Sequence, residues 1–160
     1  MNEKKSVYLE TSFISYLTGR PSRDVIAAGH QAVTQEWWEK ESEYYHLVVS
    51  ELVVREAQRG HEEAAARRLS AIDGIELLQI SDEAIDFADS LLANNVIPRV
   101  ATADAIHVSM AAINGIDYLL TWNCKHIANA DQRQYIEMLC IENNYKPPVI
   151  CTPEELMRGD

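Results

Sequence analysis

Short apolar runs alternate with longer segments of helical periodicity along the chain. The short runs are rich in β-forming residues and are bounded by polar or turn-forming positions, a pattern that predicts strands. They lie at Val7–Leu9, His46–Ser50, Glu76–Ile80, Asp117–Trp122 and Pro147–Cys151. We therefore expect a sheet of four or five strands.

The segments between these runs carry helical signals. From residue 24 to about 45, apolar or small residues recur at helical spacing, at Ile26, Gly29, Val33 and Trp37. The expected helices cover about 24–45, divided in two, then 51–58, 62–72, 81–92, 101–114 and 131–142. A hydroxyl residue in Glu10-Thr11-Ser12 can cap a helix after the first strand, and Pro153 opens a terminal helical turn.

Strands that alternate with helices predict the α/β class. Parallel neighbours need a crossover, and right-handed crossovers place helices on the faces of the sheet. The expected architecture is a three-layer α/β/α fold around a central parallel sheet. The chain has 160 residues, 47% of them hydrophobic, which suits one core and a single domain over 1–160.

Composition and charge restrict the expected cellular location and partners of the protein. No apolar run approaches the roughly 20 residues of a membrane span, so we expect no membrane association. Three cysteines without CxxC spacing fit a reduced, cytoplasmic compartment. The formal net charge of −11 repels nucleic acid at long range, unless carboxylates gather around divalent cations that reverse the local charge.

Four polar side chains follow the predicted strands in this chain. Glu10 ends the first strand, Glu56 lies one turn into the helix after the second, Asp104 opens a helix, and Asn123 ends the fourth strand. Ligands of open α/β sheets bind beyond the carboxyl ends of the strands. Three carboxylates brought together there would raise one another's pKa unless a cation neutralised them, and Mg²⁺ or Mn²⁺ suits oxygen ligands.

Each of these residues also has an ordinary structural interpretation. Glu10 fits a solvated acid at a strand end, Asp104 fits a favourable charge at a helix N-terminus, and Glu56 fits the solvent-facing side of its helix. Only their joint order along the chain separates a site from three unrelated surface acids.

That order resembles a known family. The runs VYLETSFISYL, SELVVREAQRG, ADAIHVSMAA and DYLLTWN, in this order, resemble the PIN domain and, more closely, the VapC-like toxins of toxin–antitoxin pairs. The resemblance extends from about Val7 to Cys151. It implies a divalent metal held by Glu10, Glu56 with its following Gly60, Asp104 and position 123.

The resemblance also implies an activity and partners. The expected protein is a Mg²⁺- or Mn²⁺-dependent endoribonuclease, the toxin of a type II pair, cutting RNA, with tRNA among the candidate substrates. A cognate antitoxin and a homodimer formed through the early helices are the expected partners. Two positions depart from the family pattern: Glu10 replaces the usual Asp, and Asn123 replaces the usual fourth acid.

Further polar residues lie beside the four. Thr11, Ser12 and Thr121 have hydroxyls that serve either metal-bound water or turns and caps. His107 lies one turn after Asp104, where it either touches the site or packs as a hydrogen-bonded histidine. Cys124 and His126 make a poor zinc site because two residues in CxH spacing lack partners.

Two other classes of function compete with the nuclease. The change from acid to amide at position 123 leaves open a PIN fold that only binds RNA or an antitoxin. A receiver-type signalling domain is disfavoured, because it needs an Asp after strand three and a Lys near strand five. This chain has Gln79-Ile80-Ser81 and Cys151-Thr152 there.

Overall fold

The computed structural model describes residues 3–159, and they form an α/β fold around an all-parallel sheet. The strand order is β3-β2-β1-β4-β5, so β1 lies at the centre. The register pairs Tyr8 with Val48 on one side and with Leu119 on the other. The strands are β1 (Ser6–Leu9), β2 (His46–Ser50), β3 (Glu76–Leu78), β4 (Tyr118–Leu120) and β5 (Val149–Cys151).

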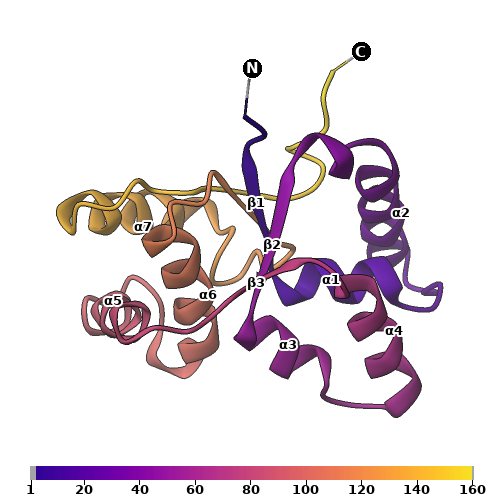
Figure 1. The fold of residues 1–160 in the computed structure, drawn as a ribbon, viewed down its shortest axis with the longest axis horizontal. Helices are drawn as coiled ribbons and strands as arrows, with labels where there is room; N and C mark the ends of the chain where they lie inside the picture. Colours follow the sequence, from indigo (N-terminus) through magenta and orange to yellow (C-terminus); the bar gives the residue numbers. More distant parts are fainter. Residues whose placement is uncertain (1–2, 160) are drawn as a thin grey trace.

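Helices cover both faces of the sheet and make the expected three layers. In Figure 1, α5, α6 and α7 gather on one side of the strands, and α1, α2 and α4 gather on the other. No helix in this part of the chain is long and apolar enough to cross a membrane. The helices are α1 (Thr11–Thr18), α2 (Val25–Lys40), α3 (Glu51–Ala57), α4 (Glu62–Ile72), α5 (Asp82–Ala93), α6 (Thr102–Ile113) and α7 (Ala130–Glu142), with short 3₁₀ turns at Ser42–Tyr44 and Arg99–Ala101.

The sequence pattern overestimated several strands and one helix. The third strand ends at Leu78, because the N–H of Ile80 donates to Oε1 of Glu51 at 2.7 Å instead of to a neighbouring strand. The fifth strand begins only after Pro147 and Pro148, which have no N–H to donate. The helical segment expected over 24–45, with a division into two helices, is α2 followed by a single 3₁₀ turn.

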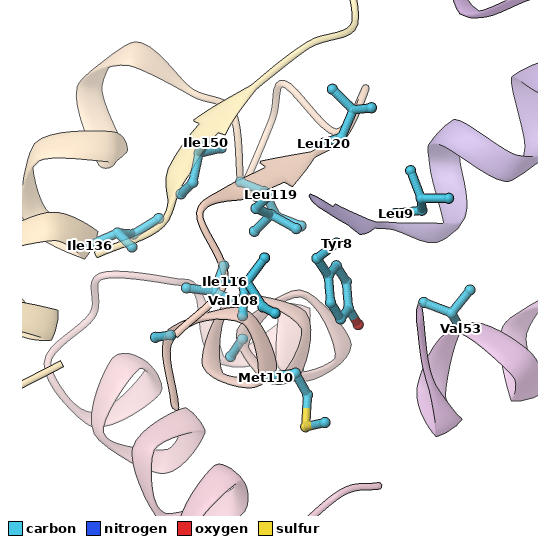
Figure 2. Packing of buried hydrophobic residues seen from close by; sticks show 14 of the residues in the cluster. Tyr8, Leu9, Val53, Val108, Met110, Ile116, Leu119, Leu120, Ile136 and Ile150 are labelled. Carbon is cyan, nitrogen blue, oxygen red and sulfur yellow. The ribbon is translucent and has the colours of Figure 1, made fainter. Parts of the chain in front are cut away.

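The core lies on both sides of the central strands. Figure 2 shows Tyr8 and Leu119 on the α6 side of the sheet, near Val108, while Leu9 and Leu120 point to the opposite side. This alternation follows from the two-residue repeat of a strand. All of these side chains are buried, so both faces of the sheet contribute to the hydrophobic core.

A polar clasp aligns the beginnings of β1 and β4. Oδ2 of Asp117 accepts the backbone N–H of Ser6 at 2.9 Å and its hydroxyl at 3.2 Å, and Oδ1 accepts from Lys146 at 2.6 Å. The hydrogen bond from Lys146, followed by that from the Ser6 backbone, holds the pKa of Asp117 below its ordinary value.

The depressed pKa predicts how the clasp responds to pH. Asp117 loses its charge at lower pH in the folded chain than in the unfolded chain, so its stabilising effect is present above its ordinary pKa of about 3.9 and is lost below it. Asp117→Asn should lower the free energy of unfolding at pH 7, and the gap from the unaltered protein should close in acid. Urea unfolding at pH 7 and pH 3 measures both, and a gap that does not depend on pH would contradict the assignment.

Candidate metal centre

Polar side chains from three elements meet near the carboxyl ends of β1 and β2. Glu10 directly follows β1, Glu56 lies in α3 after β2, and His107 lies in α6. One ligand atom from each of the three lies within 4.8 Å of the other two. The arrangement joins residues about 50 and 100 positions apart in the sequence.

Glu10 is buried and firmly held. Its Oε1 accepts hydrogen bonds from the hydroxyls of Ser12 at 2.6 Å and Thr121 at 2.5 Å, and its Oε2 accepts the backbone N–H of Ser12 at 3.0 Å. Glu10 is therefore the N-cap of α1, a role that we had expected from a hydroxyl residue. Ser12 also accepts the backbone N–H of Trp122 at 2.8 Å, which joins α1 to the end of β4.

Glu56 is held through one oxygen only. Its Oε1 accepts from the hydroxyl of Thr11 at 2.6 Å and contacts Nε2 of His107 at 2.5 Å. Burial by itself would raise the pKa of this carboxyl, but the hydrogen bonds from His107 and Thr11, together with the charge of Arg59, lower it. This direction is opposite to the one expected from repulsion between carboxylates, because the site contains a basic side chain.

His107 is fully buried between these acids and the sheet. Burial by itself would lower its pKa. The hydrogen bond to Glu56 and the negative charges of the nearby carboxylates outweigh burial, so the pKa of His107 is raised. The negative charge of Asp104, which lies one turn before His107 in α6, also contributes to this shift.

Asp104 and Asn123 are linked through a second histidine. Oδ2 of Asp104 contacts Nδ1 of His126 at 3.0 Å, and the backbone N–H of His126 donates to Oδ1 of Asn123 at 3.1 Å. Asn123 thus stabilises the turn after β4 with the same oxygen that the resemblance assigns to a metal. Its backbone N–H donates to the hydroxyl of Thr121 at 2.9 Å, and Thr121 in turn donates to Glu10.

The donor atoms fit a hard divalent cation. Oε2 of Glu56 and Oδ1 of Asp104 accept no hydrogen bond from any residue in 3–159, and Oε2 of Glu10 accepts only one. The carboxylates of Glu10 and Glu56 suit Mg²⁺ or Mn²⁺, which prefer oxygen ligands. Among the described residues, the group of donor atoms within 4.8 Å of one another contains Glu10, Glu56 and His107, and it does not contain Asp104. The oxygen of Asn123 would have to leave the His126 turn or be shared with it.

Comparisons with known proteins identify the fold. No protein-family model matches the chain, and no curated protein matches its sequence. VapC20 of Mycobacterium tuberculosis, a sarcin–ricin loop cleaving toxin, superposes with a TM-score of 0.60 at 15% identity, over 78% of this chain and 95% of that one.

Two further solved structures are similar in fold to this chain. VapBC2 of Rickettsia felis, bound to a DNA fragment from its promoter, gives a TM-score of 0.60 at 14% identity, over 92% of this chain and 98% of that one. A toxin–antitoxin complex from Klebsiella pneumoniae gives 0.54 at 16% identity, over 92% and 97%. The chain has a VapC-like PIN fold. At these identities the likeness establishes the fold alone.

Within this PIN fold, three contacts near the acids were not expected from the sequence. They are the pairing of His126 with Asp104 and the hydrogen bonds that Tyr8 makes to His107 and to Ser50. The sequence suggests His126 only as part of a poor zinc site with Cys124, which is exposed and free in the structure. The polar end of Tyr8 gave no sequence signal, because a tyrosine within a strand usually reports core packing.

A substitution in the turn after β4 tests whether Asn123 belongs to the metal site. Asn123→Asp keeps an oxygen for the His126 N–H and adds a negative charge near Asp104. If position 123 belongs to the site, Mn²⁺ should bind more than about threefold tighter and the metal-free protein should lose stability. A substitution at a surface position outside the site should change the free energy of Mn²⁺ binding or of unfolding by less than roughly 0.5 kcal/mol. Calorimetric titration and urea unfolding measure the two effects.

A matched variant separates this effect from added charge alone. Asn143→Asp makes the same substitution at the exposed end of α7, which precedes β5 and lies toward the amino ends of the strands. It should leave Mn²⁺ affinity unchanged. Equal Mn²⁺ affinities of the two variants would place Asn123 outside the site. Their stabilities are not matched, because Asn143→Asp also removes the hydrogen bond from Nδ2 of Asn143 to the carbonyl of Leu139.

Proposed function

We propose that this protein is a Mg²⁺- or Mn²⁺-dependent endoribonuclease, the toxin of a type II toxin–antitoxin pair. The observation that supports this most is the carboxylate set: Glu10, Glu56 and Asp104 come from three different elements of a PIN fold, and each keeps an oxygen available. In this proposal those three residues hold the cation, and Asn123 assists through its amide oxygen.

The side chains around the acids prepare them for this role. Glu10, Glu56 and Asp104 would hold a divalent cation, which would supply a lower pKa for water and stabilisation of the charge that develops on a phosphate and its leaving oxygen. Ser12 and Thr121 orient the carboxylate of Glu10 by donating to Oε1. Thr11 does the same for Glu56, and the low pKa of Glu56 keeps it charged at neutral pH.

RNA is the proposed substrate. VapC20, which shares the fold, is described as a sarcin–ricin loop cleaving toxin, and the resemblance in sequence motifs adds tRNA to the candidates. The net charge of −11 opposes this only at long range, because cations bound by the acids would attract phosphate locally. The free thiols of Cys124, Cys140 and Cys151 fit a reduced cytoplasm, which is the proposed location.

An antitoxin and a second copy of the chain are the proposed partners. Two of the similar structures contain toxin and antitoxin together. An antitoxin arginine placed in the acidic site would pair with carboxylates in a bidentate manner and displace the cation. Val25 and Ile26 at the start of α2 are 85% and 69% exposed, which supports a homodimer through the early helices. A monomer in analytical sedimentation at micromolar concentration would contradict the proposed homodimer.

A second candidate is a PIN fold that binds RNA or antitoxin without cutting RNA. The observation that favours it is the engagement of Asn123 with His126, which leaves three charged ligands. Weak metal binding with intact antitoxin binding is its expected signature.

One experiment separates the two candidates. Defined RNAs, including a sarcin–ricin loop RNA and tRNA, are incubated with the purified protein in Mg²⁺, in Mn²⁺ or in EDTA. The nuclease predicts discrete cuts with either metal and none with EDTA. Uncut RNA under all conditions, with Mn²⁺ binding too weak to measure by calorimetry, would favour the binding module.

A further inference from the structure

A line of hydrogen-bonded side chains runs from the start of α3 through the core to the acids. Oγ of Ser50 lies 2.7 Å from the hydroxyl of Tyr8, and that hydroxyl lies 2.7 Å from Nδ1 of His107. Nε2 of His107 lies 2.5 Å from Oε1 of Glu56. Ser50, Tyr8 and His107 are each fully buried, so water does not compete for these hydrogen bonds.

The direction of the protons follows from the partners. Oγ of Ser50 accepts the N–H of Val53 as the N-cap of α3, so its own hydrogen is available to Tyr8. The buried hydroxyl of Tyr8 then has Nδ1 of His107, 2.7 Å away, as the acceptor for its own hydrogen. This hydroxyl donates to Nδ1 of a neutral His107, which leaves the ring proton on Nε2, facing the carboxylate of Glu56.

Protonation of the ring does not change this contact. In the imidazolium form both nitrogens donate, Nδ1 to the Tyr8 oxygen and Nε2 to Glu56. Nε2 therefore carries a hydrogen in either state and has no lone pair for a metal. The proximity of His107 to Glu10 and Glu56 within 4.8 Å nevertheless resembles a three-ligand metal cluster.

We propose that Ser50, Tyr8 and His107 form a positioning chain for the carboxylate of Glu56, and that His107 is not a metal ligand. The positioning chain holds Oε1, and Oε2 would remain available to bind a cation. The inference rests on the proposed function for the identity of the bound cation, but the hydrogen-bond pattern is a property of the metal-free protein.

The geometry of Glu56 explains why it needs such support. It projects from α3, a helix of only seven residues, and its side chain is 22% exposed. A glutamate there loses side-chain freedom when it binds a metal, and prior fixation reduces that entropic cost. Thr11 and His107 both contact Oε1, so the two hydrogen bonds together hold that oxygen in place.

Nuclear magnetic resonance of the histidine ring nitrogens tests the chain directly. Spectra of the ¹⁵N-labelled protein are recorded without metal and with Mg²⁺, and His107 is assigned from its absence in His107→Gln. We expect Nε2 to carry a proton in both samples. A neutral ring protonated only at Nδ1, or loss of the Nε2 proton when Mg²⁺ binds, would overturn the proposal.

A pair of tyrosine variants provides the second test. Tyr8→Phe keeps the buried ring and removes the hydroxyl, whereas Tyr135→Phe removes an exposed hydroxyl on α7. We expect Tyr8→Phe to weaken Mn²⁺ binding in calorimetry about tenfold or more, the effect typical of residues that orient metal ligands, and Tyr135→Phe to have no effect. A Tyr8→Phe protein that is less stable but binds Mn²⁺ normally would show a purely structural role.

His107 itself has a conservative variant. His107→Gln can still donate an N–H to Glu56, and His107→Leu cannot. We expect the Gln variant to retain more of the Mn²⁺ affinity than the Leu variant, and equal losses would count against positioning by hydrogen bonding. If the unaltered protein binds no Mn²⁺, the proposed function fails, whereas the metal-free spectra still decide the hydrogen-bond chain.

Discussion

Glu56→Gln and Asp104→Asn should each lower the rate of RNA cleavage at least about 100-fold. Loss of a residue that only orients a metal ligand commonly costs 10- to 100-fold, and a ligand itself should cost at least as much. Both substitutions preserve the size of the side chain and remove its charge, and in Glu56→Gln the amide oxygen can still accept from Thr11 and His107. Single-turnover cleavage of a defined RNA with saturating Mn²⁺ measures the loss.

A control variant shows that the loss belongs to the site. Glu62→Gln removes an exposed carboxylate from the first turn of α4. Its cleavage rate should match that of the unaltered protein. If Glu56→Gln and Asp104→Asn cut RNA as fast as this control, the three carboxylates do not form a catalytic metal centre.

Trp37→Ala should lower the free energy of unfolding by about 3 to 5 kcal/mol, the usual cost of deleting a large buried aromatic side chain. Trp37 is the large, fully buried side chain of α2. Its ring meets Phe13 edge-on at 5.5 Å and stacks on Tyr45 at 5.7 Å. The substitution therefore removes one of the aromatic contacts between α2 and α1, which also include Phe13 with Trp38 and Tyr16 with His30.

A second variant at this position separates packing from polarity. The indole N–H of Trp37 is buried and has no hydrogen-bond partner in residues 3–159. Trp37→Phe removes that unsatisfied donor while keeping an aromatic ring. It should therefore lower the free energy of unfolding clearly less than Trp37→Ala does. Urea unfolding measures both, with Val100→Ala at a 93% exposed position as the control expected to change stability little. Equal losses for the Phe and Ala variants would contradict this account.

Several features of the fold were predictable from local pattern. Val7–Leu9 and His46–Ser50 are apolar runs, and the structure has strands there. The ends of the other strands were less predictable, because hydrogen bonds from distant side chains decide them. Ile80 illustrates this: its N–H pairs with Glu51, which lies 29 residues earlier.

In the candidate site, the acidic residues could be suggested from the sequence, whereas their contacts could not. Glu10, Glu56 and Asp104 could be selected from the sequence because parallel strands place their carboxyl ends at one edge of a sheet. The sequence could not indicate that His107 lies against Glu56, which is 51 positions away, or that Asp104 pairs with His126. Those contacts depend on where α3 and α6 pack relative to the sheet.

The amino-acid sequence by itself determined the α/β class, the parallel sheet and the order of the acids, because these follow from periodicity and from short-range chain geometry. Only the tertiary structure decided how each acid is held. It assigned Glu10 to the cap of α1, engaged Asn123 in a turn, and placed Tyr8 between Ser50 and His107, which are 42 and 99 positions away. Hydrogen bonds between buried groups depend on ångström-scale distances between packed elements, and no local pattern of residues contains those distances.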